Sequence, residues 1–222
     1  MAYEIVVVDY HKGNLQSVAR SVVAAVPNAD VTISDDPQTI LEAGGIILPG
    51  VGAFEDAMRF IQESGQADAI RSSAHRGTPF LGICLGLQLL FEKGSELSSD
   101  QEGSIAQDGW APGLGLIPGK ATLLESSRLK VPHVGWDQIH LTDHGRACPL
   151  LVDVAEGSNV YFTHSYAVEC DRPDLVAATT HYVRSFPSAV WWGNVYGVQF
   201  HPEKSSRTGL RILKNFVNVV RG

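Results

Sequence analysis

Apolar and polar residues follow two different periods along the first part of the chain. Continuous apolar runs occur at Glu4–Asp9, Val31–Ser34, Gly45–Leu48 and Pro79–Ile83, a pattern typical of strands buried on both faces of a parallel sheet. Between the runs, apolar residues recur every three or four positions, as from Leu15 to Val23, which predicts helices. Alternating strands and helices predict an α/β fold with helices covering a parallel sheet.

The second half of the chain has a different pattern. From Lys120 to Phe200, short β-type runs are separated by Gly, Pro, Asn and Asp, which predicts antiparallel strands and hairpins that continue the same sheet. Leu87, Leu90 and Phe91 have the spacing that begins a further helix, a surface loop covers Ser98–Ala111, and a closing helix spans Thr208–Val220. No repeat or linker divides the chain, so we expect residues 1–222 to form a single domain.

Composition and charge narrow the possible functions. The 222 residues are 44% hydrophobic and 18% charged, which is ordinary for a globular protein. A net charge of −7 provides no basic face for nucleic acid. The apolar run near the N-terminus is too short for a membrane span, and three cysteines are too few for a disulfide framework. We therefore expect a cytoplasmic protein that binds neither nucleic acid nor membrane.

Cys84 lies in a short motif that predicts a nucleophile. The sequence Gly82-Ile83-Cys84-Leu85-Gly86 follows an apolar strand and precedes a helix, as in the G-x-nucleophile-x-G elbow. Such a turn is strained, and side chains in place of the glycines would collide with neighbouring backbone. The helix N-terminus favours negative charge on the sulfur and leaves the Leu85 N–H free to bind an oxyanion. The alternative is a buried structural cysteine at a strand–helix junction.

A cysteine nucleophile requires a base and a group that orients it. His201 ends the apolar run that begins at Val195, so we expect it at a strand terminus. In extended backbone, Glu203 lies on the same side two residues later and can hold one imidazole nitrogen while the other faces Cys84. A surface turn would also explain His-Pro-Glu, but with the elbow it predicts a Cys84, His201 and Glu203 triad.

The turn Pro49–Gly52 is a candidate for the second half of the oxyanion site. It closes another predicted strand, and its glycines allow the peptide N–H groups of Gly50, Val51 and Gly52 to approach a substrate. A plain turn before the next helix is the alternative. No His, Cys, Asp or Glu spacing matches a zinc site, and no G-x-G-x-x-G follows the first strand, so we expect neither a metal nor a cofactor.

With these residues placed, the whole sequence resembles the class I, triad-type glutamine amidotransferases. It is most similar to the branch that serves histidine biosynthesis, the glutaminase subunits of imidazole glycerol phosphate synthase. The resemblance is carried by Asp9-Tyr10 with Gly13-Asn14-Leu15, Leu48–Phe54, Gly82–Leu90, Gly113–Gly119, Val131–Trp136, Tyr161–Tyr166 and Val198–Ser205.

The resemblance implies a fold, a reaction and a partner. The fold is a three-layer sandwich with a central, mostly parallel sheet extended by antiparallel strands. Glutamine is hydrolysed to glutamate and ammonia, and Gln88, His164, Ser165 and Tyr166 match positions around the substrate. The ammonia passes to a (β/α)₈-barrel cyclase subunit, which makes imidazole glycerol phosphate and aminoimidazole carboxamide ribotide. The matching positions at the interface or along the ammonia path are Asn14, Trp136, Tyr161 and Lys204.

Three other functions fit parts of the sequence. The chain could be a glutaminase for another acceptor, in an anthranilate, pyridoxal phosphate or surface-sugar pathway. It could be a stand-alone γ-glutamyl hydrolase or cysteine peptidase on the same scaffold, or a binding subunit without catalysis, although the complete Cys, His and Glu set argues against the last. One departure from the family pattern is Asp137, where the motif usually has asparagine.

Overall fold

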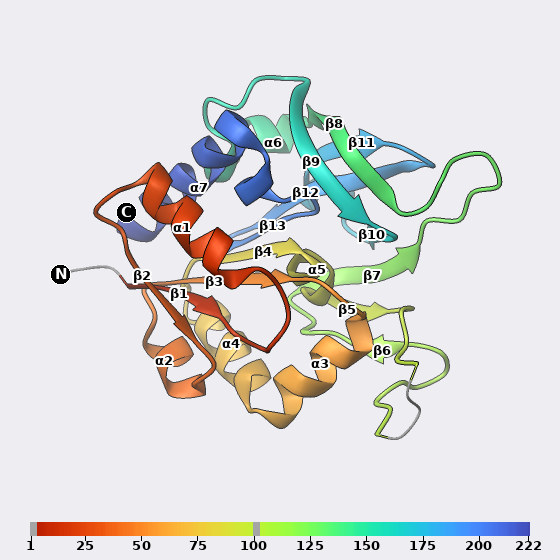
Figure 1. Cartoon of the computed structure of the whole chain (residues 1–222), viewed down its shortest axis with the longest axis horizontal. Helices are drawn as coiled ribbons and strands as arrows, with labels where there is room; N and C mark the ends of the chain where they lie inside the picture. The colour runs from red at the N-terminus through yellow and green to blue at the C-terminus, as the bar shows by residue number, and fades with distance from the viewer. Residues whose placement is uncertain (1–3, 100–102) are drawn as a thin grey trace.

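The computed structural model describes residues 4–99 and 103–222, and its largest element is a nine-stranded sheet that crosses the middle of the molecule (Figure 1). The strand order is β2-β1-β3-β4-β13-β12-β11-β8-β9. The strands are β1 (Glu4–Val8), β2 (Asp30–Ser34), β3 (Gly45–Gly50), β4 (Phe80–Cys84), β8 (His133–Leu141), β9 (Ser158–His164), β11 (Val176–His181), β12 (Ser185–Trp192) and β13 (Val195–Val198).

Two groups of helices cover the two faces of this sheet (Figure 1). One group contains α1 (Leu15–Ala25) and α7 (Ser206–Arg221), with the short α6 (Asp143–Arg146), η1 (Pro149–Leu151) and η3 (Pro202–Lys204). The other contains α2 (Pro37–Glu42), α3 (Phe54–Glu63), α4 (Gln66–His75) and α5 (Leu85–Leu89). A further short helix, η2, spans Pro173–Leu175.

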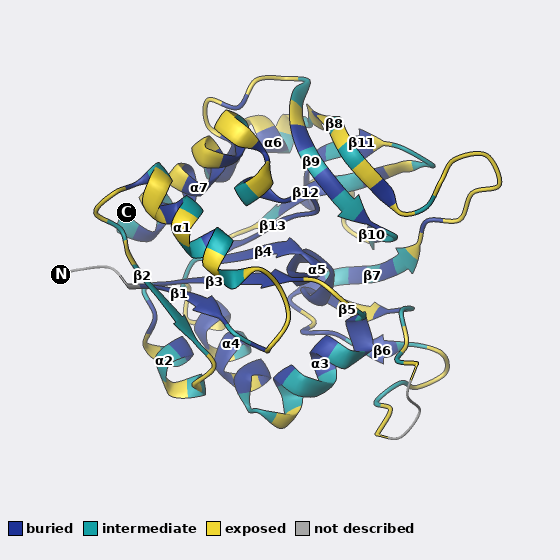
Figure 2. Cartoon of the chain, viewed as in Figure 1, coloured by how far each residue is buried: buried dark blue, intermediate teal, exposed yellow. Residues whose placement is uncertain are grey.

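Strand β1 explains why the protein has a hydrophobic core on each face of the sheet. Successive side chains of a strand point to opposite faces. Ile5 and Val7 accordingly join the core under α1 and α7, whereas Val6 and Val8 join the core under α2, α3 and α4. Figure 2 shows the central strands buried and the outer faces of the helices exposed. The predicted α/β sandwich is confirmed.

The parallel and antiparallel halves of the sheet meet at β13. This strand pairs in parallel with β4, where Val198 lies opposite Ile83, and antiparallel with β12. Strand β3 also runs parallel to β4, with Gly50 opposite Cys84. Because parallel strands end at the same edge, the residues that end or follow β3, β4 and β13 lie side by side.

The prediction that all later strands continue this sheet is wrong for part of the chain. A separate four-stranded sheet has the order β10-β7-β5-β6, with strands β5 (Phe91–Gly94), β6 (Ala111–Pro112), β7 (Ile117–Leu123) and β10 (Tyr166–Cys170). The helix predicted from Leu87 through Phe91 ends at Leu89, because Phe91 pairs with Ile117 as part of β5. The loop predicted at Ser98–Ala111 is largely irregular, and its residues 100–102 lie outside the described residues.

No helix in the described ranges, 4–99 and 103–222, is both long enough and apolar enough to cross a membrane.

Candidate active site

Cys84 occupies a strained turn between β4 and α5. Its backbone has φ 56° and ψ −109°, outside the conformations that residues other than glycine usually adopt. The flanking glycines are required by close backbone contacts. A Cβ on Gly86 would lie 1.7 Å from the carbonyl oxygen of Leu48, and one on Gly82 would lie 2.6 Å from that of Gly86. The strained elbow expected from the sequence is therefore present, with Cys84 at the end of the strand.

His201 and Glu203 form a buried pair at the neighbouring strand end. His201 Nδ1 lies 2.8 Å from Glu203 Oε1, and the two side chains are 5% and 3% exposed. The expected extended backbone is absent here, because Pro202–Lys204 form the short helix η3. The carboxylate reaches the imidazole from this turn. Ser205 Oγ also donates to the His201 carbonyl, which fixes the start of the turn.

The second nitrogen of His201 is on the side of the Cys84 sulfur. His201 Nε2 is buried and has no hydrogen-bond partner at ordinary distance within residues 4–99 and 103–222. Burial alone would lower the pKa of His201, but Cys84 on one side and the Glu203 carboxylate on the other raise this pKa to about 10. The imidazole is therefore suited to hold a proton beside a negatively charged sulfur.

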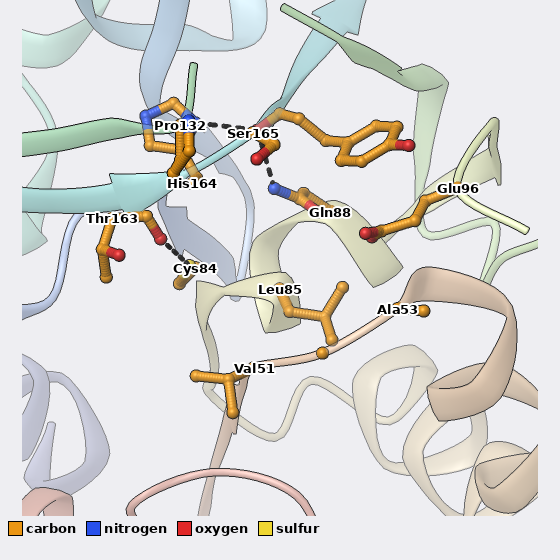
Figure 3. Close-up of a pocket in the computed structure, with 12 residues that line it drawn as sticks. Val51, Ala53, Cys84, Leu85, Gln88, Glu96, Pro132, Thr163, His164 and Ser165 are labelled. Atoms are coloured by element: carbon orange, nitrogen blue, oxygen red, sulfur yellow. Dashed lines mark hydrogen bonds between the residues drawn. The ribbon is translucent and has the colours of Figure 1, made fainter. Parts of the chain in front are cut away.

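A cavity of about 400 Å³ opens in front of Cys84. Val51 and Ala53 lie on one side of it, Thr163 and His164 on the other, and Cys84 between them (Figure 3). The full set of lining residues is Val51, Gly52, Ala53, Cys84, Leu85, Gln88, Glu96, Pro132, Thr163, His164, Ser165 and Tyr166. This set includes all the residues predicted to surround an oxyanion or a substrate except Gly50. His201 is not part of the lining; it is 4% exposed and adjoins the cavity through Cys84.

A network of side-chain amides joins the sulfur to the cavity wall. Gln199 Nε2 lies 3.7 Å from Cys84 Sγ as a donor. Gln88 Nε2 donates to Gln199 Oε1 at 3.2 Å and to the Tyr166 carbonyl at 2.9 Å. Gln199 was not among the predicted site residues. Its signal in the sequence is a single amide within an apolar run. In the structure this amide is fully buried, and a buried polar side chain requires a partner.

The predicted oxyanion turn lies over a buried tyrosine. Gly50 is opposite Cys84 in the sheet, Val51 is 45% exposed, and Gly52 has φ 103°. The Tyr10 hydroxyl is buried beneath Gly50 and has no hydrogen-bond partner among the described residues. Burial and the nearby Cys84 raise the pKa of Tyr10, which keeps this hydroxyl neutral. On the other side of the cavity mouth, Leu85 begins α5, where the first N–H groups have no acceptor within the helix.

Glu96 places a carboxylate at the far end of the cavity and was also not predicted (Figure 3). Its Oε2 accepts a hydrogen bond from the Phe54 N–H at 3.1 Å, and burial raises its pKa. The Tyr166 pKa is raised by burial and by this same carboxylate. An acidic group at one end and a sulfur nucleophile near the other suit an elongated substrate that has an amino group at one end.

Three of the four predicted interface residues lie together on the surface. The rings of Trp136 and Tyr161 meet edge to face at 6.0 Å, and Lys204 Nζ lies 5.8 Å from the centre of the Tyr161 ring. Trp136 is 54% exposed, which excludes the alternative that it packs in the core. Asn14 has a local role, because its Oδ1 caps α1 by accepting from the Ser17 N–H at 3.3 Å.

The remaining cysteines differ from Cys84. Cys148 is buried in the core, and its burial raises its pKa to about 11. Cys170 is half-buried, and burial raises its pKa as well. In the part of the chain that the structure describes, no group of three or more His, Cys, Asp or Glu side chains is arranged to hold a metal ion.

Comparison with known proteins places this geometry in a family. The family described as "Glutamine amidotransferase class-I" matches residues 6–220. The chain belongs to this family.

Curated relatives narrow the assignment within the family. The chain is 41% identical to imidazole glycerol phosphate synthase subunit HisH of Geobacillus sp. (strain WCH70), covering 97% of each protein. It is 46% identical to the HisH subunit of Gloeobacter violaceus over 96% of this chain and 88% of the relative. It is 47% identical to the HisH subunit of Halobacterium salinarum over 96% of this chain and 92% of the relative. The particular group to which the chain belongs is therefore HisH, the glutamine amidotransferase subunit of imidazole glycerol phosphate synthase.

Solved structures share the fold at low sequence identity. A crystal structure of a glutamine amidotransferase has a TM-score of 0.68, with 16% identity over 98% of this chain and 99% of that one. The glutaminase domain of CTPS from Trypanosoma brucei, solved with bound acivicin, has a TM-score of 0.61. Its sequence identity is 16% over 97% of this chain and 94% of that domain's chain. These two structures support the fold assignment.

Proposed function

We propose that this histidine-pathway glutamine amidotransferase hydrolyses L-glutamine through Cys84, His201 and Glu203 and passes the ammonia to a cyclase subunit. One observation carries the proposal. The sulfur lies at the end of β4, the imidazole follows the adjacent strand β13, and the carboxylate holds the imidazole Nδ1 at 2.8 Å. This arrangement provides a nucleophile, a proton carrier and an orienting group around one cavity.

In the proposed reaction the Cys84 sulfur attacks the side-chain amide carbon of glutamine. The C=O electron pair moves to oxygen, and N–H groups of the Gly50–Gly52 turn and Leu85 stabilise the resulting oxyanion. His201 donates its proton to the nitrogen, the C–N bond breaks, and ammonia leaves a glutamyl thioester on Cys84. His201 then removes a proton from water, which attacks the thioester and releases glutamate. Glu203 orients the imidazole in both steps.

The cavity provides a binding site for each end of glutamine. The Glu96 carboxylate lies at the end of the cavity away from the elbow, where it is placed to bind the α-ammonium group. Gln88, His164, Ser165 and Tyr166 form the wall alongside the substrate chain. The reaction as written requires no metal or cofactor, because the thiolate and imidazole supply both the nucleophile and the proton transfers.

The ammonia has to reach an acceptor before it takes up a proton from water, so we propose a partner docked close to the cavity. The partner is a (β/α)₈-barrel cyclase subunit that forms a heterodimer with this chain. Trp136, Tyr161 and Lys204 form an aromatic and cationic surface cluster suited to such docking, and Asn14 is the fourth residue proposed for the interface or the ammonia path. We further propose that residues 1–222 act as a single domain in the cytoplasm.

The first experiment tests the nucleophile. The full chain is incubated with an electrophilic glutamine analogue, and the modified residue is identified by mass spectrometry. We expect labelling at Cys84, protection by L-glutamine and loss of labelling in Cys84→Ser. Cys170→Ser is the matched control, because Cys170 is more exposed than Cys84 but lies outside the cavity. Labelling at Cys170 alone would contradict the proposed triad.

The second experiment tests the pathway. The chain is purified with a candidate cyclase subunit, and glutamate release is measured with and without the ribotide acceptor. We expect glutamate release to rise when partner and acceptor are both present. Equal turnover by the isolated chain, with peptides or folyl-glutamates as substrates, would instead indicate a stand-alone hydrolase. Support of a different synthase would indicate another acceptor.

A further inference from the structure

A chain of polar contacts runs from Asp137 on β8, through two buried imidazoles, into the cavity wall. His133 Nε2 lies 3.4 Å from Asp137 Oδ2, and His133 Nδ1 lies 3.2 Å from His164 Nε2. His164 Nδ1 lies 2.8 Å from the Tyr166 carbonyl, which also accepts from Gln88. The imidazoles of His133 and His164 are both buried, at 3% and 6% exposure. These contacts link Asp137, next to the exposed Trp136, with residues that line the cavity.

The positions of the protons follow from the acceptor at the inner end. A carbonyl oxygen can only accept, so His164 Nδ1 carries a proton and donates to Tyr166. Burial, partly opposed by this hydrogen bond, together with the nearby His133 and His201 lowers the pKa of His164 to about 3, so the ring is neutral. Its Nε2 is therefore an acceptor, and His133 Nδ1 has to donate to it.

This requirement leaves no proton for the contact between His133 Nε2 and Asp137 Oδ2. A neutral His133 that is protonated on Nδ1 has a lone pair on Nε2. Asp137 faces it with Oδ2, while its Oδ1 accepts from the Gln138 N–H at 2.8 Å. Two acceptors cannot form a hydrogen bond, so this contact is attractive only when one additional proton resides on His133 Nε2 or on Asp137. An asparagine at this position would donate from its own amide and would need no such proton.

We propose that Asp137, His133 and His164 form a proton-dependent positioning relay for the glutamine-binding wall. With the shared proton present, every contact from Asp137 to the Tyr166 carbonyl is a hydrogen bond, and the wall is fixed. When that proton is lost, Asp137 and His133 repel one another, His133 is no longer held, and glutamine binds more weakly. This inference rests on the proposed function, because glutamine is taken as the ligand of the cavity.

The surroundings of His133 limit what else can titrate against it. Its own strand contributes Asp137, and β9 contributes His164. The turn after β11 contributes Tyr182, whose ring stacks on His133 at 4.0 Å and whose hydroxyl donates to the Lys130 carbonyl. The rings of Phe162 and Phe186 complete the contacts. Burial lowers the pKa of His133, and Asp137 partly opposes this shift.

The experiment measures glutamine binding by calorimetry in the full chain, alone and with its cyclase subunit, using Cys84→Ala to prevent turnover. With Asp137 present, we expect the dissociation constant to rise roughly fivefold between about pH 5 and about pH 8, the range in which histidine titrates. Asp137→Asn should bind tightly across the whole range, because its amide donates to neutral His133. Asp137→Ala should bind weakly across the range.

A matched control and an independent readout make the result decisive. Glu156→Gln alters another histidine–carboxylate pair of β8, His140 with Glu156 at 2.9 Å, which is exposed, and should leave the pH profile unchanged. Nitrogen NMR of His133 should show a second ring proton appearing at low pH in the parent and a shifted titration in Asp137→Asn. Identical pH profiles and identical His133 titrations in these two proteins would overturn the relay. Failure of the parent to bind glutamine at any pH would instead overturn the proposed function, and the NMR titration would still test the relay.

Discussion

A methyl group at Gly50 should strain the turn that is proposed to bind the oxyanion. In Gly50→Ala, the new Cβ would lie 1.9 Å from the Tyr10 hydroxyl oxygen, 3.0 Å from Leu85 Cβ and 3.2 Å from Tyr10 Cζ. The first contact is impossible, and the ring of Tyr10 is fully buried, so either the ring or β3 has to move. Overpacking of this kind costs about 2 kcal/mol of unfolding free energy.

Tyr10→Phe provides the matched test of this reasoning. It removes the colliding oxygen, which has no hydrogen-bond partner among the described residues, so the substitution alone should change stability little. In this background Gly50→Ala meets only the contacts at 3.0 and 3.2 Å and should cost about 1 kcal/mol. The double-mutant cycle is therefore expected to show about 1 kcal/mol of favourable coupling between positions 10 and 50.

Urea denaturation of the four proteins measures the coupling, and glutamate release with the partner measures the effect on the site. Gly50→Ala should lower kcat, because a shift of β3 moves the oxyanion donors, and Tyr10→Phe should restore part of that loss. Additive changes in unfolding free energy, or full activity of Gly50→Ala, would refute the close contact between Tyr10 and the turn.

Three other predictions concern buried charge. Glu203→Gln should lower kcat about 100-fold and lower the pKa of His201, measured by kinetics and by NMR titration. Folding raises the pKa of His201 from 6.5 to about 10, so the stability that this histidine contributes is complete below about pH 6.5 and should be lost as the pH rises through about 10. The unfolding free energy of His201→Gln should not show this loss. Glu55→Gln should lower the unfolding free energy by about 2 kcal/mol in urea, because Glu55 is buried and accepts from Ser98, Ser104, Ile105 and Ala106, whereas Glu63→Gln should have little effect.

The central strands and the elbow could be predicted because their signals are local. The apolar run that ends at Cys84 and the two glycines beside it determine both the strand and the turn, and close backbone contacts at Gly82 and Gly86 explain why. The sequence also predicted that His201 would emerge beside Cys84, since an apolar run precedes it. What remained hidden was the short helix at Pro202–Lys204, which replaces the extended backbone.

The second sheet and the amide network depend on partners far away in the chain. The apolar spacing from Leu87 to Phe91 fits a continued helix, and only pairing with Ile117 makes Phe91 part of a strand. Gln199 reads as one polar residue in an apolar run, and its partners Cys84 and Gln88 precede it by 115 and 111 residues. Local periodicity contains no information about such contacts.

The central position of β13 in the sheet has a consequence for folding during translation. During translation, β4 emerges long before β13, so the strand that ends at Cys84 has an unpaired edge until residues 195–198 have left the ribosome. Insertion of β13 between β4 and β12 then closes the sheet and brings the imidazole to the sulfur in the same event. Under the proposed mechanism, a stalled nascent chain that lacks β13 therefore cannot consume glutamine, and its open edge is a target for chaperones.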